Sequence, residues 1–414
     1  SMLRSRGFMP HVVPRRVITV LAASLVFLSS PIHAQNEIRA LWVVRTTLTS
    51  PSAIETMVTA ARNGGFNTLL VQVRGRGDAY FQEGLEPRPA ALAAQPGFDP
   101  LATTIARAHA AGLQVHAWIN VNLVASAAEL PPAREHVIYR HPEWLMVPRA
   151  LADDLANTDP HSPGYVGRLA RYARAQSAEV EGLYLSPVSA ESAAYTTAVV
   201  RDIAQRYEID GVHFDYIRYP TSDFDYSRET LAAFRGSVMR DLAAPDLSRY
   251  DARVAAGDLL IYTQAFPDRW RGFRASRLTA LLGSLRAAVK AVRPAVVVSV
   301  AVVPDPREAA THRLQDWPAW LDSGLIDVVC PMAYTTDAAA FASQIAAAKQ
   351  AAGSHALWAG IGAYRLSSEQ IVDNTQTARR LGVAGVILFS YDSLADGAHG
   401  PGYVSQVGRA AFQF

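Results

Sequence analysis

The stretch Asp210-Gly-Val-His-Phe-Asp-Tyr-Ile-Arg-Tyr-Pro220 combines a predicted buried strand with chemically active side chains. Its first part is mostly apolar, as is typical of a strand buried in a parallel sheet. Its end carries Asp215 and Arg218, and in a (β/α)8 barrel the carboxyl ends of the strands hold the chemistry. The alternative is a buried Asp–Arg pair that only ties the strand to its loop. Three neighbouring side chains favour the functional interpretation: His213, Tyr216 and Tyr219.

On both sides of this stretch, short apolar runs alternate with amphipathic helical segments, which predicts βα units and a parallel sheet. We therefore predict an α/β fold, a (β/α)8 TIM barrel that forms a single domain over residues 35–414. The expected strands are Ile38–Val44, Thr68–Val73, Gln114–Ile119, Gly211–Tyr216, Val296–Val302, Asp327–Met332, Ala356–Gly360 and Val386–Phe389. The expected helices are Ser52–Asn63, Pro100–Ala111, Ala193–Tyr207, Ser276–Val292, Ala338–Ala351 and Ser368–Leu381.

Two connections are much longer than the others. Residues 121–192 follow the third strand, and residues 217–275 follow the fourth. Loops of this length in a compact domain usually carry function or small elements of their own. Both leave the carboxyl ends of strands, so we expect them to form walls of a cleft on the catalytic face.

Residues 1–34 have the pattern of a secretory signal peptide. Arg15-Arg16 precedes an apolar run, Val17–Leu28, and a cleavage point is expected after Ala34. The run is short for a transmembrane helix, although an uncleaved anchor is the alternative. We therefore expect an exported protein, periplasmic or secreted, with no membrane association after cleavage.

Charge and cysteine content exclude several classes of protein. The formal net charge is +2, and loss of residues 1–34, with four arginines and no acid, leaves −2. No basic field remains to indicate a nucleic acid or an anionic membrane as partner. Cys330 is the only cysteine, so no disulfide forms within the chain, and its apolar neighbours favour a buried thiol over a nucleophile. The sequence does not indicate an oligomeric state.

Nearly every predicted strand is followed by polar or aromatic side chains on the same rim. Aromatic faces stack on sugar rings, and polar groups bind their hydroxyls, so this rim is typical of a saccharide site. Arg45 follows the first strand, and Arg74-Gly-Arg-Gly-Asp78 follows the second. The residues we expect to bind a polysaccharide or oligosaccharide are Arg74, Asp78, Trp118, Asn120, His213, Arg218, Tyr219, Tyr334, Asp337 and Tyr391.

Cleavage of a glycosidic bond requires two carboxyl groups, one that donates a proton and one that acts as nucleophile or base. We expect Asp215 to be the anionic member, held ionised by Arg218 and the neighbourhood of His213 through charge pairing. Asp392 and Asp305 are the leading candidates for the proton donor. Ordinary loop capping, the usual role of an aspartate after a strand, is the alternative for each of them. Further candidates for the donor are Asp337, Asp78 and Glu83.

Other chemistries lack their motifs, and no cofactor is expected. Arg74-Gly-Arg-Gly-Asp78 is not followed by the Lys-Ser/Thr ending of a phosphate-binding loop. No His-x-x-x-His or cysteine pair indicates a metal site, and no Gly-x-Ser-x-Gly elbow indicates an esterase. The remaining alternatives to a glycosidase are a non-catalytic glycan-binding barrel and a metal-dependent deacetylase.

The chain resembles the bacterial glycoside-hydrolase-like family ten over about residues 37–395. The motifs that carry the resemblance are Arg39-Ala-Leu-Trp-Val43, Gln72–Tyr80, Asp99-Pro-Leu101, His116-Ala-Trp-Ile-Asn120, His141-Pro-Glu-Trp-Leu145, Asp210–Pro220, Gln315-Asp-Trp317, Pro331-Met-Ala-Tyr334 and Phe389-Ser-Tyr-Asp392. The combination of Asp210–Pro220 with Pro331–Tyr334 is specific, because a generic barrel would not have both.

This resemblance implies an exported TIM-barrel glycosidase of the cell envelope, acting on a β-linked amino-sugar glycan such as peptidoglycan strands stripped of peptides. Asp215 matches the carboxylate of the family's strand-4 motif. One departure is Leu185-Ser-Pro187, where the family has an Asp-Pro pair, within a segment lengthened at about Asp153–Glu181. The resemblance also assigns five cleft positions: Asp78, Trp118, Asn120, Tyr334 and Asp392.

Overall fold

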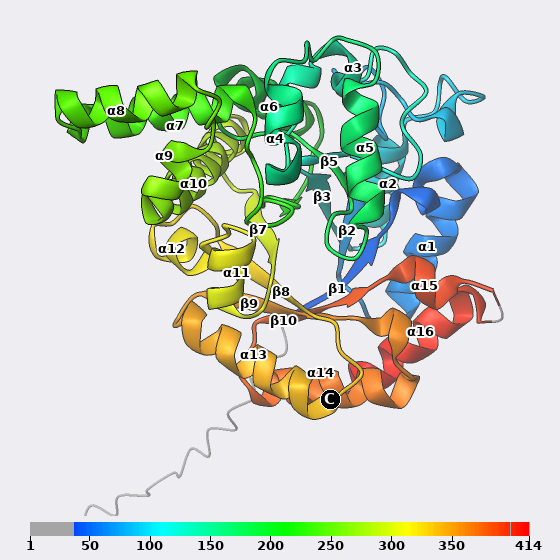
Figure 1. Cartoon of the computed structure of the whole chain (residues 1–414). Coiled ribbons are helices and arrows are strands. Elements are labelled where there is room, and N and C mark those ends of the chain that lie inside the picture. The colour runs from blue at the N-terminus through cyan, green and yellow to red at the C-terminus, as the bar shows by residue number, and fades with distance from the viewer. Residues whose placement is uncertain (1–36, 398, 414) are drawn as a thin grey trace, which may run out of the picture. The chain divides into compact units, whose positions relative to one another are not determined.

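Eight parallel strands close into a barrel in the computed structural model, which describes residues 37–397 and 399–413 (Figure 1). The predicted signal segment, 1–34, lies outside the described residues. Around the barrel the strand order is β1-β10-β9-β8-β7-β6-β3-β2, which confirms the TIM-barrel prediction. The strands are β1 Ile38–Val43, β2 Thr68–Arg74, β3 Gln114–Asn120, β6 Gly211–Asp215, β7 Val297–Val302, β8 Val328–Ala333, β9 Ala356–Ile361 and β10 Gly385–Phe389.

Helices cover the outside of the barrel, as its apolar outer surface requires (Figure 1). Several begin with a Ser or Asp side chain that accepts a hydrogen bond from the first turn, which is why the helices start where they do. The helices that follow strands are α1 Pro51–Asn63, α2 Pro100–Ala110, α6 Ala190–Arg206, α10 Pro267–Val292, α11 Pro306–His312, α12 Trp317–Asp322, α13 Ala338–Ala352, α14 Ser368–Arg380, α15 Tyr391–Ala395 and α16 Gly400–Ala411.

The amino-terminal edge of the barrel is fastened by polar residues that precede strands. Asn67 Oδ1 accepts a hydrogen bond from the backbone NH of Arg39 at 2.9 Å. Asp210 Oδ2 accepts one from Val115 at 2.8 Å, and Asp327 Oδ2 accepts one from Val298 at 2.8 Å. Each contact joins one strand to its neighbour, so this edge serves stability, as is usual for the barrel face opposite the active site.

The first long connection builds a small layer above the barrel. Its strands β4 (Leu123–Ser126) and β5 (Gly182–Tyr184) pair antiparallel, and Leu145 and Leu185 form a further bridge beside them. The connection also contains the helices α3 Val137–Arg140, α4 Ala152–Ala156 and α5 Tyr165–Ala175. Its own apolar cluster, which includes Trp144 and Leu183, keeps this layer ordered.

The second long connection packs on the amino-terminal part of α10. It contains α7 Arg228–Val238, α8 Ala244–Ala255 and α9 Ile261–Ala265, which gather beside α10 (Figure 1). Trp270 lies 5.0 Å from Phe234 between ring centroids and donates from its indole NH to the Tyr226 hydroxyl at 3.1 Å. Buried Asp225 joins this layer to the first connection, because it accepts hydrogen bonds from the backbone NH of Val147 and from the Thr230 hydroxyl.

Within the described part of the chain, no helix is both long enough and apolar enough to cross a lipid bilayer.

Candidate active site

A cavity of about 410 Å³ opens at the carboxyl ends of the barrel strands. The ends of β1, β2, β3, β6, β8 and β10 all contribute to it, as do both long connections. This is the position of active sites in TIM barrels. Its lining consists of Trp42, Val44, Arg45, Gln72, Arg76, Trp118, Glu181, Asp215, Tyr216, Arg218, Met332, Tyr334 and Phe389.

Aromatic rings form one wall of this mouth cavity. Tyr334 and Phe389 stack with centroids 5.6 Å apart, and Trp42 packs against both rings in a T-shaped arrangement. The indole NH of Trp42 donates to His213 Nε2 at 3.0 Å. This hydrogen bond holds the Trp42 ring in place from the barrel interior. Rigid aromatic surfaces beside polar groups suit the apolar faces of sugar rings.

Asp215 is the last residue of β6 and one of the two carboxyl groups in the lining. Its Oδ1 accepts a hydrogen bond from the backbone NH of Tyr216 at 2.7 Å, and the residue is only 8% exposed. Burial raises the pKa of Asp215 to about 6. The negative charge of Glu181 also acts to raise this pKa, while Tyr216 and Arg218 act against the rise. The carboxyl group therefore stays partly protonated in weakly acidic solution.

Tyr216 follows Asp215 in a backbone conformation that is uncommon for a side-chain-bearing residue. Its φ is 51°, in the left-handed region that favours glycine. Such a conformation costs about 1–3 kcal/mol, and it persists where the surrounding structure enforces it, often at functional sites. Here it brings the Tyr216 amide to the Asp215 carboxyl group and its side chain to the cavity.

Glu181 supplies the second carboxyl group, from the position directly before β5. Arg218 Nη2 lies 2.7 Å from its Oε1, and the Tyr184 hydroxyl donates to its Oε2. Burial acts to raise the pKa of Glu181, but the charge of Arg218 and the two hydrogen bonds outweigh it, so this pKa lies below its usual value. Glu181 is therefore ionised when Asp215 still holds its proton.

The arrangement reverses one expectation from the sequence. Arg218 was expected to hold Asp215 ionised, but its guanidinium pairs with Glu181 instead. Because Asp215 lacks an ion pair of this kind and is deeply buried, its pKa rises where a fall was expected. The two carboxyl groups thus have pKa values that are pushed apart, as in sites where one acid donates a proton and the other stays charged.

Four of the residues predicted for the site line the mouth cavity: Trp118, Asp215, Arg218 and Tyr334. Three others support loops behind it. Asp78 Oδ1 accepts from the backbone NH groups of Gly75 and Arg76, and Asn120 Nδ2 donates to the Gly75 carbonyl. Asp392 accepts from the Val44 backbone NH at 2.6 Å and from the Thr47 hydroxyl.

The remaining predicted residues are engaged away from the cavity. Arg74 forms a buried ion pair with Glu86 and donates to the backbone carbonyls of Asn120 and Val121 at the end of β3. His213 lies inside the barrel, where burial first, and then His116, lower its pKa to about 3. Tyr219 and Tyr391 are buried in the core.

Two predicted acids serve as helix caps. Asp305 accepts hydrogen bonds from the backbone NH groups of Arg307 and Glu308, at the start of α11. Asp337 does the same for Ala339 and Ala340 at the start of α13. Neither acid lines the mouth cavity.

Sequence reasoning did not select Glu181, because no motif surrounds it and its chain neighbours lie in a long connection. Trp42, Gln72 and Phe389 were also left out, although each lies near the end of a predicted strand. The rule that marked Asp215, a polar or aromatic residue at a strand end, applies equally to these three. This rule does not apply to Glu181, which follows no barrel strand. The antiparallel pairing of β4 with β5 places Glu181 at the barrel mouth.

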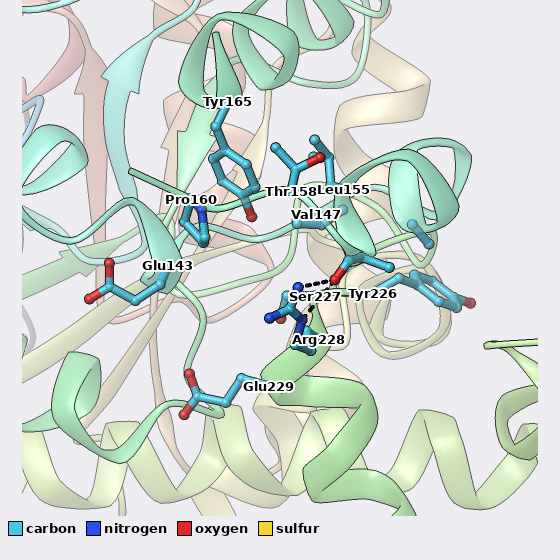
Figure 2. A pocket seen from close by; sticks show the side chains of 12 residues that line it. Glu143, Val147, Leu155, Thr158, Pro160, Tyr165, Tyr226, Ser227, Arg228 and Glu229 are labelled. Carbon is cyan, nitrogen blue, oxygen red and sulfur yellow. Dashed lines mark hydrogen bonds between the residues drawn. The ribbon is translucent and has the colours of Figure 1, made fainter. Parts of the chain in front are cut away.

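A second cavity, of about 270 Å³, lies between the two long connections (Figure 2). Glu143 and Glu229 are its acids, and Tyr165 projects into the same region. The Arg228 guanidinium donates to the Ala156 carbonyl. No barrel strand contributes to this side cavity, so we take the mouth cavity as the candidate active site.

Among the described residues, no group of three or more His, Cys, Asp and Glu side chains is arranged to hold a metal ion. Cys330 is fully buried, and burial raises the pKa of its thiol.

The closed eight-strand barrel, with a cavity at the carboxyl ends of its strands, places the protein in the TIM-barrel class. The chain belongs to the family glycosyl hydrolase-like 10, whose model matches residues 37–374, and this confirms the resemblance found in the motifs.

Two curated relatives are similar to parts of the chain. Glycosyl hydrolase DigH of Escherichia coli (strain K12) is 22% identical over 298 residues, which are 65% of this chain and 55% of DigH. Glycosyl hydrolase YngK of Bacillus subtilis (strain 168) is 25% identical over 162 residues, 38% of this chain and 26% of YngK. The chain thus matches about half of one relative and a quarter of the other.

Solved structures share the fold. The PgaB (BpsB) glycoside hydrolase domain from Bordetella bronchiseptica aligns with a TM-score of 0.61 at 17% identity, covering 90% of this chain and 98% of that domain. The catalytic domain of β-amylase from Paenibacillus polymyxa aligns with a TM-score of 0.59 at 12% identity, covering 92% and 99%. At these identities the likeness is one of fold.

Proposed function

We propose that the protein is an exported glycoside hydrolase that cleaves a cell-wall glycan, peptide-free peptidoglycan strands being the leading substrate. The observation that carries this proposal is the pair of carboxyl groups in one cavity, Asp215 with a raised pKa and Glu181 with a lowered one. Paired acids with separated pKa values are what glycosidic bond cleavage requires. Family membership and the names of the relatives support the same activity.

In this mechanism Asp215 is the general acid. As the bond between the anomeric carbon and the glycosidic oxygen breaks, Asp215 transfers its proton to that oxygen, and the leaving sugar departs as an alcohol. Burial keeps the proton on Asp215 at weakly acidic pH, so the group is ready to donate. Tyr334 and Phe389, the partly exposed aromatic rings of the lining, provide surfaces on which the sugar rings stack.

Glu181 is the anionic partner. Either it attacks the anomeric carbon and water later releases the sugar, or it removes a proton from a water molecule that attacks directly. Arg218 and Tyr184 orient the carboxylate and keep it ionised in both cases. Retention or inversion of the anomeric configuration in the first product, read by NMR, distinguishes the two routes.

Export and the cell-wall substrate rest on the sequence. Residues 1–34 have the pattern of a signal peptide, and the family motifs imply a β-linked amino-sugar glycan. Amino-terminal sequencing of the mature protein tests the first point, with cleavage expected after Ala34. A mature protein that keeps residues 1–34 contradicts it.

Release of reducing ends from peptide-free peptidoglycan strands tests the activity. We expect the Asp215→Asn variant to lose it by roughly three orders of magnitude or more, because the amide cannot donate the proton. Circular dichroism controls for folding. Undiminished cleavage by Asp215→Asn would refute the mechanism, whereas glycan binding without turnover by the wild type favours a non-catalytic binding barrel.

A further inference from the structure

Two guanidinium groups face the mouth cavity without an acidic partner. Arg45 follows β1 and Arg76 follows β2, and both line the cavity. Within residues 37–397 and 399–413, neither forms an ion pair, whereas Arg74 pairs with Glu86 and Arg218 pairs with Glu181. Of the three arginines that line the cavity, Arg218 is therefore paired within the protein, whereas Arg45 and Arg76 are not.

The contacts of the two side chains leave hydrogen-bonding capacity unused. Arg45 Nη1 donates to Gln72 Oε1 at 3.0 Å, and Arg76 Nη1 donates to the Gly75 carbonyl at 2.9 Å. Arg76 Nε is buried and has no hydrogen-bond partner. Buried donors are nearly always satisfied, so an unpaired one calls for an acceptor that is supplied by a ligand or by water.

Electrostatics gives the same indication. Burial, and next the repulsion by Arg45, lower the pKa of Arg76, so the two like charges are held together at a cost. Asp78 acts to raise the pKa of Arg76, but its Oδ1 accepts from the backbone NH groups of Gly75 and Arg76 and thereby holds the loop. An anionic ligand group between the two guanidiniums would relieve the repulsion.

The loop after β2 is shaped for this arrangement. A Cβ atom at Gly75 would come within 2.6 Å of Arg45 Cδ, so a larger residue there would displace the Arg45 side chain. Arginine forks bind carboxylates with two parallel hydrogen bonds, which gives geometric specificity as well as attraction. The lining has three arginines and two acids, which disfavours a glycan that carries ammonium groups.

We propose that Arg45 and Arg76 bind a carboxylate carried by a sugar residue of the glycan, and so select acidic glycans over neutral ones. The inference rests on the proposed function, because it takes the mouth cavity as the place where the sugar chain binds. Two kinds of sugar supply such a carboxylate: a hexuronic acid, in which it is part of the sugar, and a muramic acid, in which it belongs to a lactyl ether. Conversion of that lactyl carboxylate to a peptide amide would remove the charge that the arginines recognise.

Binding of matched oligosaccharides tests the proposal. Isothermal titration calorimetry uses the mature Asp215→Asn protein, which prevents turnover, with a muramic-type and a hexuronic-type oligosaccharide and the carboxyl-reduced form of each. We expect one of the two carboxylated ligands to bind at least about tenfold more tightly than its reduced form. That pair identifies the source of the carboxylate.

Variants then assign the preference to the two arginines. Arg76→Gln and Arg45→Gln, each added to the same protein, are expected to bring the two affinities of that pair within about twofold. The reduced ligand should lose much less affinity than the carboxylated one, which separates loss of the charge contact from general damage to the cavity. Arg307→Gln removes an exposed arginine at the start of α11 and should keep the full preference.

Equal affinities within both pairs, or no binding of any of the four ligands, would overturn this inference. So would an Arg76→Gln variant that loses the reduced and carboxylated ligands to the same degree. Failure of the proposed function has a different signature: Asp215→Asn would still cleave glycan, whatever its preference between the paired ligands.

Discussion

The carboxyl-terminal rim of the barrel is built differently on its two sides. After β7 and β8 the chain enters a helix within a few residues, and the acids there, Asp305 and Asp337, accept hydrogen bonds from the first turn of α11 and α13. After β6 the next helix, α7, does not begin until Arg228. Asp215 therefore has no helix start to cap, and its carboxyl group faces the cavity.

This difference shows that an aspartate after a barrel strand is not functional by position alone. A helix amino terminus has unpaired NH groups, and a nearby carboxylate binds them and is thereby withdrawn from chemistry. A long connection leaves the carboxylate available and can bring a second acid over the barrel. Here the connection after β3 brings Glu181.

On the side of the rim where the long connections follow the strands, the largest effect on glycan cleavage is expected from Glu181→Gln. We expect the rate of glycan cleavage to fall by about a thousandfold, because the amide is neither a nucleophile nor a base. Reducing-end release measures the loss. Glu229→Gln in the side cavity removes a carboxylate of the same type and should leave the rate within about twofold. Similar losses in both variants would break the distinction between the two cavities.

The pH dependence of cleavage should sharpen the assignment of the general acid. Asp215 must be protonated and its pKa is about 6, so kcat/KM should fall about tenfold per pH unit above 6. Glu181 must be ionised, and its lowered pKa places the acidic limb below the ordinary range of a glutamate. A rate that stays constant from pH 6 to pH 8 would contradict the role of Asp215.

The pH dependence of the free energy of unfolding provides an independent test of the raised pKa of Asp215. The folded-state pKa of Asp215 lies above its unfolded value of 3.8, so its contribution to stability is present below pH 3.8 and is lost as the pH rises through 6. The loss is about 3 kcal/mol at most, from a shift of roughly two units. Denaturant unfolding should show this loss in the wild type and not in Asp215→Asn.

The smallest effects on activity are expected after β7 and β8, where short loops lead directly into helices. Asp305→Ala should leave kcat/KM within about twofold of the wild type, because the side chain caps α11 and does not line the mouth cavity. Its free energy of unfolding should fall by about 1 kcal/mol, the usual cost of a lost amino-terminal cap. A loss of activity of a hundredfold or more would restore Asp305 as a catalytic acid.

Much of the fold could be predicted because its signals are local. The apolar runs of the eight strands and the Ser, Asp and Gly residues at helix ends act through neighbouring residues, so most predicted bounds lie within one or two residues of the observed ones. The prediction starts α6 and α10 too late, at Ala193 and Ser276, where the structure has Ala190 and Pro267. Both helices extend into the long connections, where no strand pattern limits them.

The site was predictable only where a strand end reached the cavity. Asp215, Trp118 and Tyr334 all lie at such ends. Asp392 and Asn120 lie at similar ends, but their hydrogen bonds hold Val44 and Gly75, which lie beside the cavity. Whether a polar group at a strand end faces the ligand or supports a loop depends on contacts with segments distant in the sequence.

The sequence by itself determined the barrel and the placement of Asp215 at its mouth, because hydrophobic periodicity and helix capping depend on residues close together in the chain. Only the tertiary structure decided which acid faces Asp215. The pairing of β4 with β5 brings Glu181 to Arg218, across 37 residues of the chain, and burial then leaves Asp215 protonated while Glu181 is charged. Burial and charge pairing are properties of the folded surroundings, and no local pattern encodes them.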